Sequence, residues 1–231
     1  MSQAIGMSRE QLLEVAENVE ALRGNQVVIK VGGDLIADDQ QKDILAEDID
    51  ILGDFGIYPI IVHGGGPQID SKLDKYGLKR EKVDGVRKTP QGSVPHVIEA
   101  LDDVNEELVA AINEKAGGDL AIGVNDHVFS AELADFDDFG SSENIDVDSS
   151  SVGKIANESK VAVVNCSGRL CIAQTIEMAR RGFLDESSTK RPRININADL
   201  TAAALAKHLG VYKYVSLTKA GAVLDSQGGR I

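Results

Sequence analysis

The feature that most constrains the fold is a phrase that the chain repeats: a short β-branched apolar run, then glycine or small polar residues, then a segment of helical periodicity. The expected strands cover residues 26–31, 58–63, 120–124, 160–165 and 212–217. The expected helices cover residues 40–55, 67–76, 94–116, 171–181 and 199–209. Such alternation predicts an α/β fold with a mainly parallel sheet covered on both faces, and ligands bound beyond the carboxyl ends of its strands.

Three segments need separate interpretation. Residues 1–24 form a helical stretch with an apolar stripe, which fits either an oligomerisation arm or a helix packed on its own domain. Within the helix at 40–55, the side chains expected to face the core are Ile44, Ile51 and Leu52. Residues 135–151 are acidic and rich in serine, so we expect an exposed, mobile loop or hairpin that buries little surface.

Composition excludes several classes of function. The 231 residues carry a formal net charge of -13, which disfavours a surface for nucleic acid. No apolar run reaches the roughly 18 to 20 residues of a membrane-spanning helix, and the N-terminus lacks a signal-peptide pattern, so a cytoplasmic location is expected. Two cysteines are too few for a disulfide framework, and neither the cysteines nor the histidines have the spacing of a metal site.

The stretch HGGGPQID, residues 63–70, places Gly64, Gly65 and Gly66 between an expected strand and an expected helix. Glycine lets backbone N–H groups approach a bound anion without a Cβ in the way, and a helix N-terminus adds favourable partial charge. Pro67 suits the first helical position. The stretch therefore predicts an anion-binding turn.

A second glycine turn follows the first strand, in IKVGG, where Gly32 and Gly33 come directly after it. Lys30, near the end of that strand, would place an ammonium beside the same anion. Either turn alone is also compatible with a tight turn of no special function. Neither matches the P-loop pattern GxxxxGK[ST] or the dinucleotide pattern GxGxxG, so those nucleotide folds are disfavoured.

Two further stretches offer groups for a carboxylate ligand. In RININAD, Asn195, Asn197 and Asp199 alternate, which predicts one shared face on an extended segment. Asn195 would donate amide hydrogens to a carboxylate, while Asp199 also fits the role of a helix N-cap. In DGVRKTP, Arg87 fits a bidentate clamp on a carboxylate, or alternatively a solvated loop arginine.

Taken in order, IKVGG, HGGGPQID, VDGVRKTP, NINAD and SLTKAGAVLD resemble the amino acid kinase family. Within it they resemble the N-acetylglutamate kinases, including the kinase domain of bifunctional N-acetylglutamate synthase/kinase proteins. The resemblance runs from about residue 27 to residue 231 and implies a three-layer αβα sandwich. It divides the chain into an N-terminal helical arm, residues 1–24, and an amino acid kinase domain, residues 25–231.

The resemblance also implies a reaction, the ATP-dependent phosphorylation of the side-chain carboxylate of N-acetylglutamate, with Mg²⁺ accompanying the nucleotide. Lys30 and Asp199 would be the catalytic pair. The acceptor-binding residues implied are Gly64, Gly65, Gly66, Arg87 and Asn195. The nucleotide-binding residues implied are Gly32, Gly33 and Gly221. A homo-oligomer with small-molecule substrates is expected, without nucleic-acid or membrane partners.

The sequence also departs from the family pattern. Members carry most of the nucleotide lobe beyond LTKAGAVLD, so the resemblance predicts an acceptor lobe with only the start of a nucleotide lobe. This leaves a second hypothesis, a non-catalytic module that binds N-acetylglutamate or arginine or supports oligomerisation. Residues 168–193 are longer than the hairpin usual in the family, and Lys190, Arg191 and Arg193 are expected to crowd the approach to Asn195. Lys88 adds a cation beside Arg87.

Overall fold

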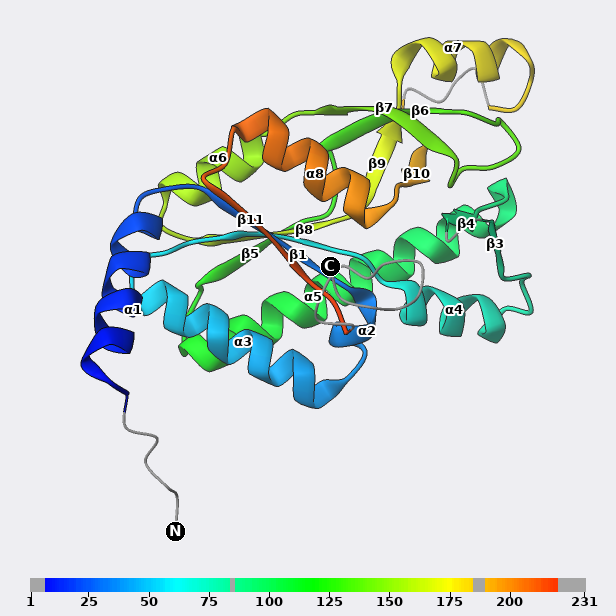
Figure 1. Cartoon of the computed structure of the whole chain (residues 1–231). Helices are drawn as coiled ribbons and strands as arrows, with labels where there is room; N and C mark the ends of the chain where they lie inside the picture. The colour runs from blue at the N-terminus through cyan, green and yellow to red at the C-terminus, as the bar shows by residue number, and fades with distance from the viewer. Residues whose placement is uncertain (1–6, 84–85, 185–189, 220–231) are drawn as a thin grey trace, which may run out of the picture.

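The computed structural model describes residues 7–83, 86–184 and 190–219. Its centre is a five-stranded sheet whose neighbouring strands pair in parallel (Figure 1). The strand order is β11 (Lys213–Leu217), β1 (Val27–Val31), β2 (Ile60–His63), β8 (Val161–Asn165) and β5 (Ala121–Val124). Each of these strands lies within a range expected from the sequence, so the predicted parallel α/β sheet is confirmed.

Helices cover both faces of this sheet, which confirms the three-layer αβα architecture. One face packs against α3 (Asp39–Asp54) and α5 (Val94–Ala116), and the other packs against α6 (Ser150–Asn157) and α8 (Ala198–Leu209). Successive β1 residues alternate between the two layers, because side chains of a strand point to opposite faces. All five residues of β1 and of β8 are buried, as the apolar runs predict.

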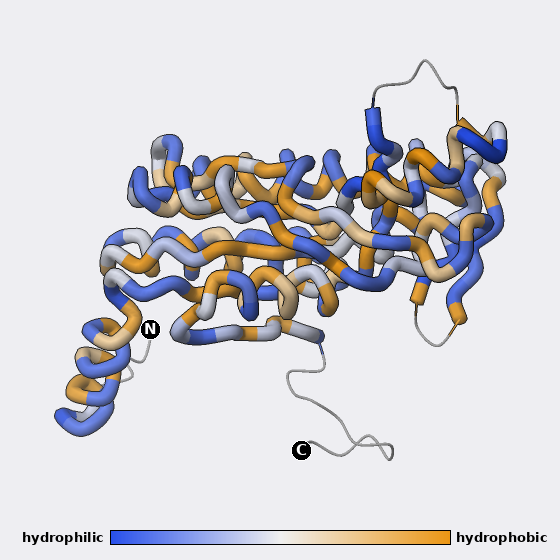
Figure 2. Tube along the Cα trace, turned by 90° about the horizontal axis from the view of Figure 1, so that it is seen from above, coloured by the Kyte–Doolittle hydropathy of each residue, from blue (hydrophilic) through white to orange (hydrophobic). Residues whose placement is uncertain are grey.

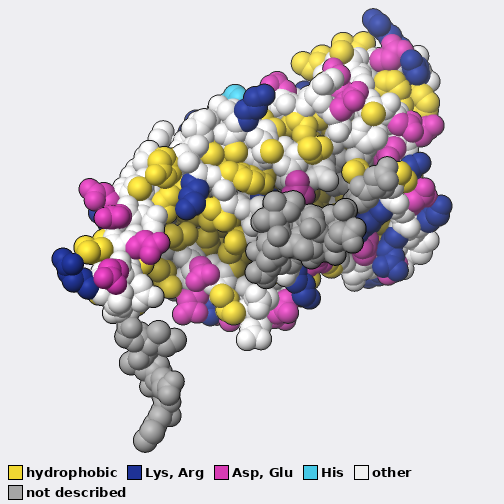
Figure 3. Space-filling model, in the orientation of Figure 1, with side chains coloured by type: hydrophobic (Ala, Val, Ile, Leu, Met, Phe, Trp, Pro, Cys, Tyr) yellow, Lys and Arg dark blue, Asp and Glu magenta, His cyan; other side chains and the backbone are white. Residues whose placement is uncertain are grey.

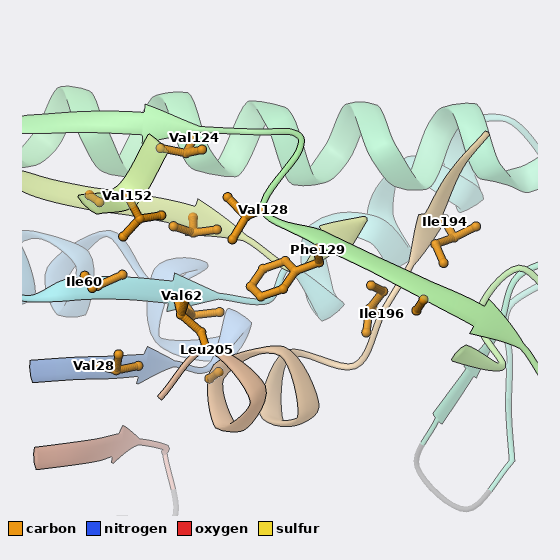
Figure 4. Packing of buried hydrophobic residues seen from close by; sticks show 14 of the residues in the cluster. Val28, Ile60, Val62, Val124, Val128, Phe129, Val152, Ile194, Ile196 and Leu205 are labelled. Atoms are coloured by element: carbon orange, nitrogen blue, oxygen red, sulfur yellow. The ribbon is translucent and has the colours of Figure 1, made fainter. Parts of the chain in front are cut away.

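The larger buried cluster lies between the sheet and α8, around Phe129 (Figure 4). In the close-up view Val62 and Val128 lie beside that ring, and Val28 and Leu205 extend the cluster toward β1 and α8. Each fully buried side chain of this size stabilises the fold by about 1.5–3 kcal/mol relative to an exposed one. This cluster holds α8 against the sheet, and α8 begins at the candidate site.

The stripe predicted for α3 is wrong in register. Ile44 and Ile51 are 44% and 46% exposed, and the buried positions are Leu45, Ala46 and Ile49. Leu52 is partly buried against the same cluster, as expected. Residues 45, 49 and 52 follow the i, i+4, i+7 spacing of one helical face, whereas residues 44 and 51 lie on its flank.

A second sheet, absent from the sequence prediction, packs beside the first. Its strand order is β10 (Arg193–Asn195), β9 (Ser167–Leu170), β6 (Phe129–Leu133) and β7 (Ser142–Val147). The hairpin of β6 and β7 contains much of the segment predicted as a loop or hairpin. We expected this segment to bury little surface, and this is wrong at its turn. There Phe139 is 2% exposed, and Asp138 and Gly140 are also buried.

The remaining elements frame one end of the domain. The helix expected at 171–181 is present as α7 (Ile172–Arg180), and the helix expected at 67–76 is α4 (Gly66–Lys75). A short helix, α2 (Gly33–Ile36), follows β1. A small antiparallel hairpin of β3 (Glu81–Val83) and β4 (Val86–Lys88) lies beside α4 and leads into a 3₁₀ turn, Gln91–Ser93.

The first helix, α1 (Arg9–Leu22), projects from the body of the domain (Figure 2). None of its residues is buried, and only its C-terminal end packs on the domain, through a partly buried Leu22. Leu12, Leu13 and Val15 are exposed. Figure 3 shows further hydrophobic side chains on the face that carries the edge strand β11, where Tyr214 is exposed. The predicted helix is confirmed, and its role in an oligomer stays a prediction.

Within the part of the chain that the structure describes, no helix has both the length and the apolar character needed to cross a membrane.

The packed turn at 138–140 yields a prediction for stability. A Cβ on Gly140 would collide with the Arg87 carbonyl oxygen and lie 2.8 Å from Thr89 Oγ1. Because the first contact is to backbone, Gly140→Ala should lower the free energy of unfolding by about 1–3 kcal/mol in urea titrations. Gly153→Ala, in α6 with open space around the new Cβ, is the matched control and should leave stability equal or higher. Equal stability of the two variants would contradict the packing described.

Candidate functional site

The two glycine turns lie side by side at the carboxyl edge of the central sheet. β1 and β2 are neighbours in register, with Lys30 beside Val62 and Val31 beside His63, so both strands end at the same level. A Cβ on Gly33 would lie only 2.7 Å from the backbone nitrogen of Gly66. Absence of a side chain is therefore what allows the turns to touch, and the convergence predicted from the sequence is present.

Both turns open helices that lack a side-chain cap. Gly32 precedes α2 and Gly65 precedes α4, and neither supplies a side chain to the first helical N–H groups. By contrast, Asp38 caps α3 and Asn197 caps α8. The first N–H groups of α4 carry the positive end of its dipole, so this uncapped end is suited to an anion.

Gln68 connects the two turns and was not singled out from the sequence. Its Nε2 donates a hydrogen bond of 3.3 Å to the carbonyl oxygen of Gly33, across 35 positions of the chain. The bond ties the start of α2 to the first turn of α4. No local pattern marks a glutamine for such a contact, since its partner is distant in the sequence.

Lys30 and Asp199 form an ion pair of 2.8 Å between Nζ and Oδ1. The lysine side chain is 10% exposed, while the aspartate side chain is 64% exposed. A lysine this deeply buried needs a charged partner, because burial of an unpaired ammonium is costly. The pair is bonded as the resemblance implied, and its carboxylate is open to solvent.

The segment NINAD does not place its three polar residues on one face, as the alternation predicted. α8 begins at Ala198, so Asp199 lies in the first helical turn and not on an extended strand. Its N-cap is Asn197, whose Oδ1 accepts from the N–H of Asp199 at 2.7 Å and of Leu200 at 3.4 Å. The N-cap interpretation of Asp199 is therefore wrong, and its carboxylate is free for Lys30.

α8 also reaches the second glycine turn. A Cβ on Gly64 would lie 3.3 Å from the Cβ of Ala198, the first residue of α8. The N-terminus of α8, the end of β1 and both glycine turns therefore form one site. Three stretches of sequence meet here, and the third begins more than 130 positions after the second.

His63 supports the second turn from beneath. It is fully buried, and Nδ1 bonds the carbonyl oxygen of Gly64 at 3.1 Å while Nε2 lies 3.0 Å from the amide nitrogen of Asn105. Because the Asn105 nitrogen also donates to Val163, His63 Nε2 accepts and Nδ1 carries the proton. Burial lowers the pKa of His63 to about 4, so the ring is neutral near pH 7.

Arg87 lies on β4 with its side chain only 6% exposed, so the interpretation as a solvated loop arginine is wrong. Its Nη2 pairs with the carboxylate of Asp70 and donates to the carbonyl oxygen of Gly66 at 3.2 Å. Arg87 is thereby attached to the helix that the second glycine turn opens.

Asn195 is buried at the end of β10, where its amide nitrogen donates to Thr89 Oγ1 at 3.4 Å. The turn of the β6–β7 hairpin joins these residues. Phe139 donates to the Thr89 carbonyl at 2.8 Å and accepts from the Asn195 N–H at 2.9 Å, and Asp138 accepts from the N–H of Thr89 at 2.7 Å. Thr89 follows Arg87 by two positions in the chain. The turn at residues 138–140 therefore links the strand that carries Arg87 to the strand that carries Asn195.

The expected crowding of Asn195 by basic residues does not hold for Arg193. Its guanidinium forms two bonds with the carboxylate of Asp102, at 2.6 and 2.8 Å, and donates to Ser167 Oγ at 2.7 Å. The charge is thus paired with α5. Arg193 holds β10 in place and presents no free cation beside Asn195.

Other residues singled out from the sequence have simple outcomes. Gly221 lies outside the described residues. Cys166 is buried, and burial raises its thiol pKa to about 12, so it is not a nucleophile near neutral pH. Among the described residues, no three His, Cys, Asp or Glu side chains gather as a metal site would require.

Comparison with known proteins agrees with this geometry. The amino acid kinase family profile matches residues 25–231, and the chain belongs to that family. It is 34% identical to the acetylglutamate kinase of Sulfurimonas denitrificans over 221 residues, which cover 94% of this chain and 72% of that protein. It is 29% identical to the acetylglutamate kinase of Aquifex aeolicus over 228 residues, 94% of this chain and 73% of that protein.

Solved structures share the fold. N-acetylglutamate synthase from Neisseria gonorrhoeae, complexed with coenzyme A and L-arginine, superposes with a TM-score of 0.73 at 18% identity, over 96% of this chain and 50% of that one. Giardia carbamate kinase gives a TM-score of 0.57 at 16% identity, over 88% of this chain and 76% of that one. Membership of the family implies an ATP-using phosphotransferase that acts on a carboxyl group.

The buried His63 predicts a pH dependence of stability. Its pKa is about 4 in the folded state and near 6.5 when unfolded, so the unfolded chain takes up a proton that the folded chain resists. As pH falls from 6.5 to 4, this group should remove about 3 kcal/mol from the free energy of unfolding. Urea titrations across this range should show a shallower loss for His63→Gln than for the wild type. The exposed-site control His208→Gln should follow the wild type, and identical slopes for all three would refute the assignment.

Proposed function

We propose that this protein phosphorylates the side-chain carboxylate of N-acetyl-L-glutamate with ATP, a cytoplasmic step of arginine biosynthesis. The observation that carries the proposal is the Lys30–Asp199 ion pair at the edge where two glycine turns touch. In phosphoryl transfer the protein need not form covalent bonds with the substrates, because most of the rate acceleration comes from positioning them and from stabilising charge in the transition state. The site offers groups for both tasks.

Lys30 would place its ammonium against the phosphoryl group in flight and offset the charge that develops on its oxygens. Asp199 would hold that ammonium in position through the 2.8 Å bond. The low exposure of the Lys30 side chain strengthens its electrostatic effect, since little water screens it. No covalent enzyme intermediate is required.

The glycine turns would bind the phosphates through backbone N–H groups other than those of Gly32 and Gly64, which already donate to neighbouring strands. In this proposal Gly32 and Gly33, with Gly221, contact the nucleotide, while Gly64, Gly65 and Gly66 contact the acceptor and the transferred group. Support comes from the uncapped N-terminus of α4 and from the contact between the two turns. Mg²⁺ would arrive with ATP, held mainly by phosphate oxygens, as is usual for this ion.

Arg87 and Asn195 would bind the α-carboxylate of the acceptor. Both side chains are buried, and the Asp138–Gly140 turn links the segments that carry them. A buried guanidinium near an amide donor suits a carboxylate ligand. With the acceptor held at this end and ATP at the glycine turns, the attacking oxygen and the γ-phosphorus need only be aligned.

The assembly is also part of the proposal. α1 exposes Leu12, Leu13 and Val15 and has no buried residue, which supports a role as an arm in a homo-oligomer.

The direct test of the reaction is incubation with MgATP and N-acetylglutamate, followed by trapping of the acyl phosphate with hydroxylamine. The proposal predicts a hydroxamate that depends on both substrates. Calorimetric binding of N-acetylglutamate or arginine without turnover, and without ATP binding, would favour the alternative of a non-catalytic module.

Removal of the Lys30 ammonium is the most direct mutational test of the proposed catalytic role. Lys30→Ala should lower kcat by about 100- to 1,000-fold, because one preorganised charge contact with the transition state is lost. Lys115→Ala is the matched control, since Lys115 pairs with Asp43 at the C-terminal end of α5 and should keep wild-type kcat. Steady-state kinetics measure both variants. Full activity of Lys30→Ala would eliminate the catalytic role of this residue.

A further inference from the structure

We infer that Asp70 is a positioning residue, which orients the Arg87 guanidinium so that its Nη1 atom binds the acceptor carboxylate. The inference rests on the proposed function for the identity of the acceptor. Asp70 lies on α4, one helical turn after Gly66, and was not among the residues selected from the sequence. Its carboxylate pairs with Arg87 Nη2.

The two terminal nitrogens of Arg87 have different surroundings. Nη2 forms an ion pair with the carboxylate of Asp70 and donates a hydrogen bond to the Gly66 carbonyl oxygen, so both of its contacts lie within the protein. Nη1 is buried and has no hydrogen-bond partner among the described residues. A buried donor of a charged group without an acceptor is unfavourable, so Nη1 is suited to an oxygen supplied by a ligand.

This asymmetry changes how Arg87 would grip its ligand. A bidentate clamp through both terminal nitrogens, as the sequence suggested, would require Nη2 to leave Asp70 and Gly66. With those contacts kept, the acceptor binds Arg87 through Nη1 and completes its binding elsewhere, Asn195 being the other donor predicted for the acceptor carboxylate. The guanidinium is then fixed before the acceptor arrives, which lowers the ordering cost of binding.

The local charge remains favourable for an anion. Asp70 contributes one negative charge, while Arg87 and Lys82, whose Nζ lies 3.7 Å from Asp70 Oδ2, contribute two positive charges. The Asp70 side chain is only partly exposed, so its bond to Arg87 is not a solvated surface pair. Because Asp70 and Gly66 belong to the same helix, the acceptor grip is fixed relative to the second glycine turn.

The kinetic experiment compares Asp70→Asn with Asp74→Asn. Asp74 lies one turn further along α4 and also pairs with an arginine, Arg80, but this pair is half exposed, which makes it a matched control. Asp70→Asn should raise KM for N-acetylglutamate about tenfold or more, with KM for ATP and kcat within about threefold of the wild type. Asp74→Asn should change neither KM. Equal effects of Asp70→Asn on both KM values would overturn the inference.

A double-mutant cycle tests whether Asp70 acts through Arg87. In an Arg87→Lys background, Asp70→Asn should add less than about twofold to KM for the acceptor, because its target is already gone. A full tenfold addition would contradict the positioning role.

A spectroscopic measurement decides the point even if the reaction is different. With arginine-selective ¹⁵N labelling, and Arg87→Lys to assign the signal, the Arg87 guanidinium should show separate, slowly exchanging Nη resonances in the ligand-free wild type. Asp70→Asn should average these resonances, and Asp74→Asn should preserve them. Unchanged Arg87 resonances in Asp70→Asn would overturn the inference. Lack of turnover with N-acetylglutamate in the wild type would instead refute the proposed function.

Discussion

The parallel pairing of β1 with β2 is the constraint on which the rest of the site depends. Two adjacent parallel strands end at one edge, and the residues that follow them must then share a small space. Gly33 and Gly66 satisfy this condition because a Cβ on the first would come within 2.7 Å of the second's nitrogen. The glycines are therefore required by packing before any ligand is considered. The uncapped N–H groups at the start of α4 then give the same edge its capacity for anions.

The position of the Lys30 ammonium at this edge depends on the burial of β1 and on the ion pair with Asp199. Lys30 points from a strand whose five residues are all buried, and its ammonium is stabilised by Asp199 at the start of α8. α8 in turn is held by the cluster around Phe129 and Leu205. Asn197 caps the helix and so leaves the Asp199 carboxylate available. Hydrophobic packing, a helix cap and one ion pair thus determine together where the ammonium lies.

The sequence predicted the central sheet well because its strands carry local signals: apolar runs, glycine stops and helical spacing. It did not predict the second sheet, whose strands are short and pair across long separations, such as β6 with β9. The same limit applies to the site. Lys30 and the glycine turns are marked by local motifs. Gln68, Thr89 and Asp70 instead act through partners 17 to 106 positions away, which are Gly33, Asn195 and Arg87 respectively. The burial of the turn in the acidic 135–151 segment was not predicted. Asp138 can be buried there because its carboxylate accepts hydrogen bonds from two backbone N–H groups, and the polarity of the segment alone does not reveal these bonds.

In the proposed function, both glycine turns and Lys30 hold a single phosphoryl group. A crystal structure with Mg²⁺, a non-hydrolysable ATP analogue and N-acetylglutamate tests it most directly. We expect the γ-phosphate to lie within hydrogen-bond distance of Lys30 Nζ and of backbone N–H groups from both turns. A γ-phosphate bound away from Lys30, or touching only one of the turns, would contradict it.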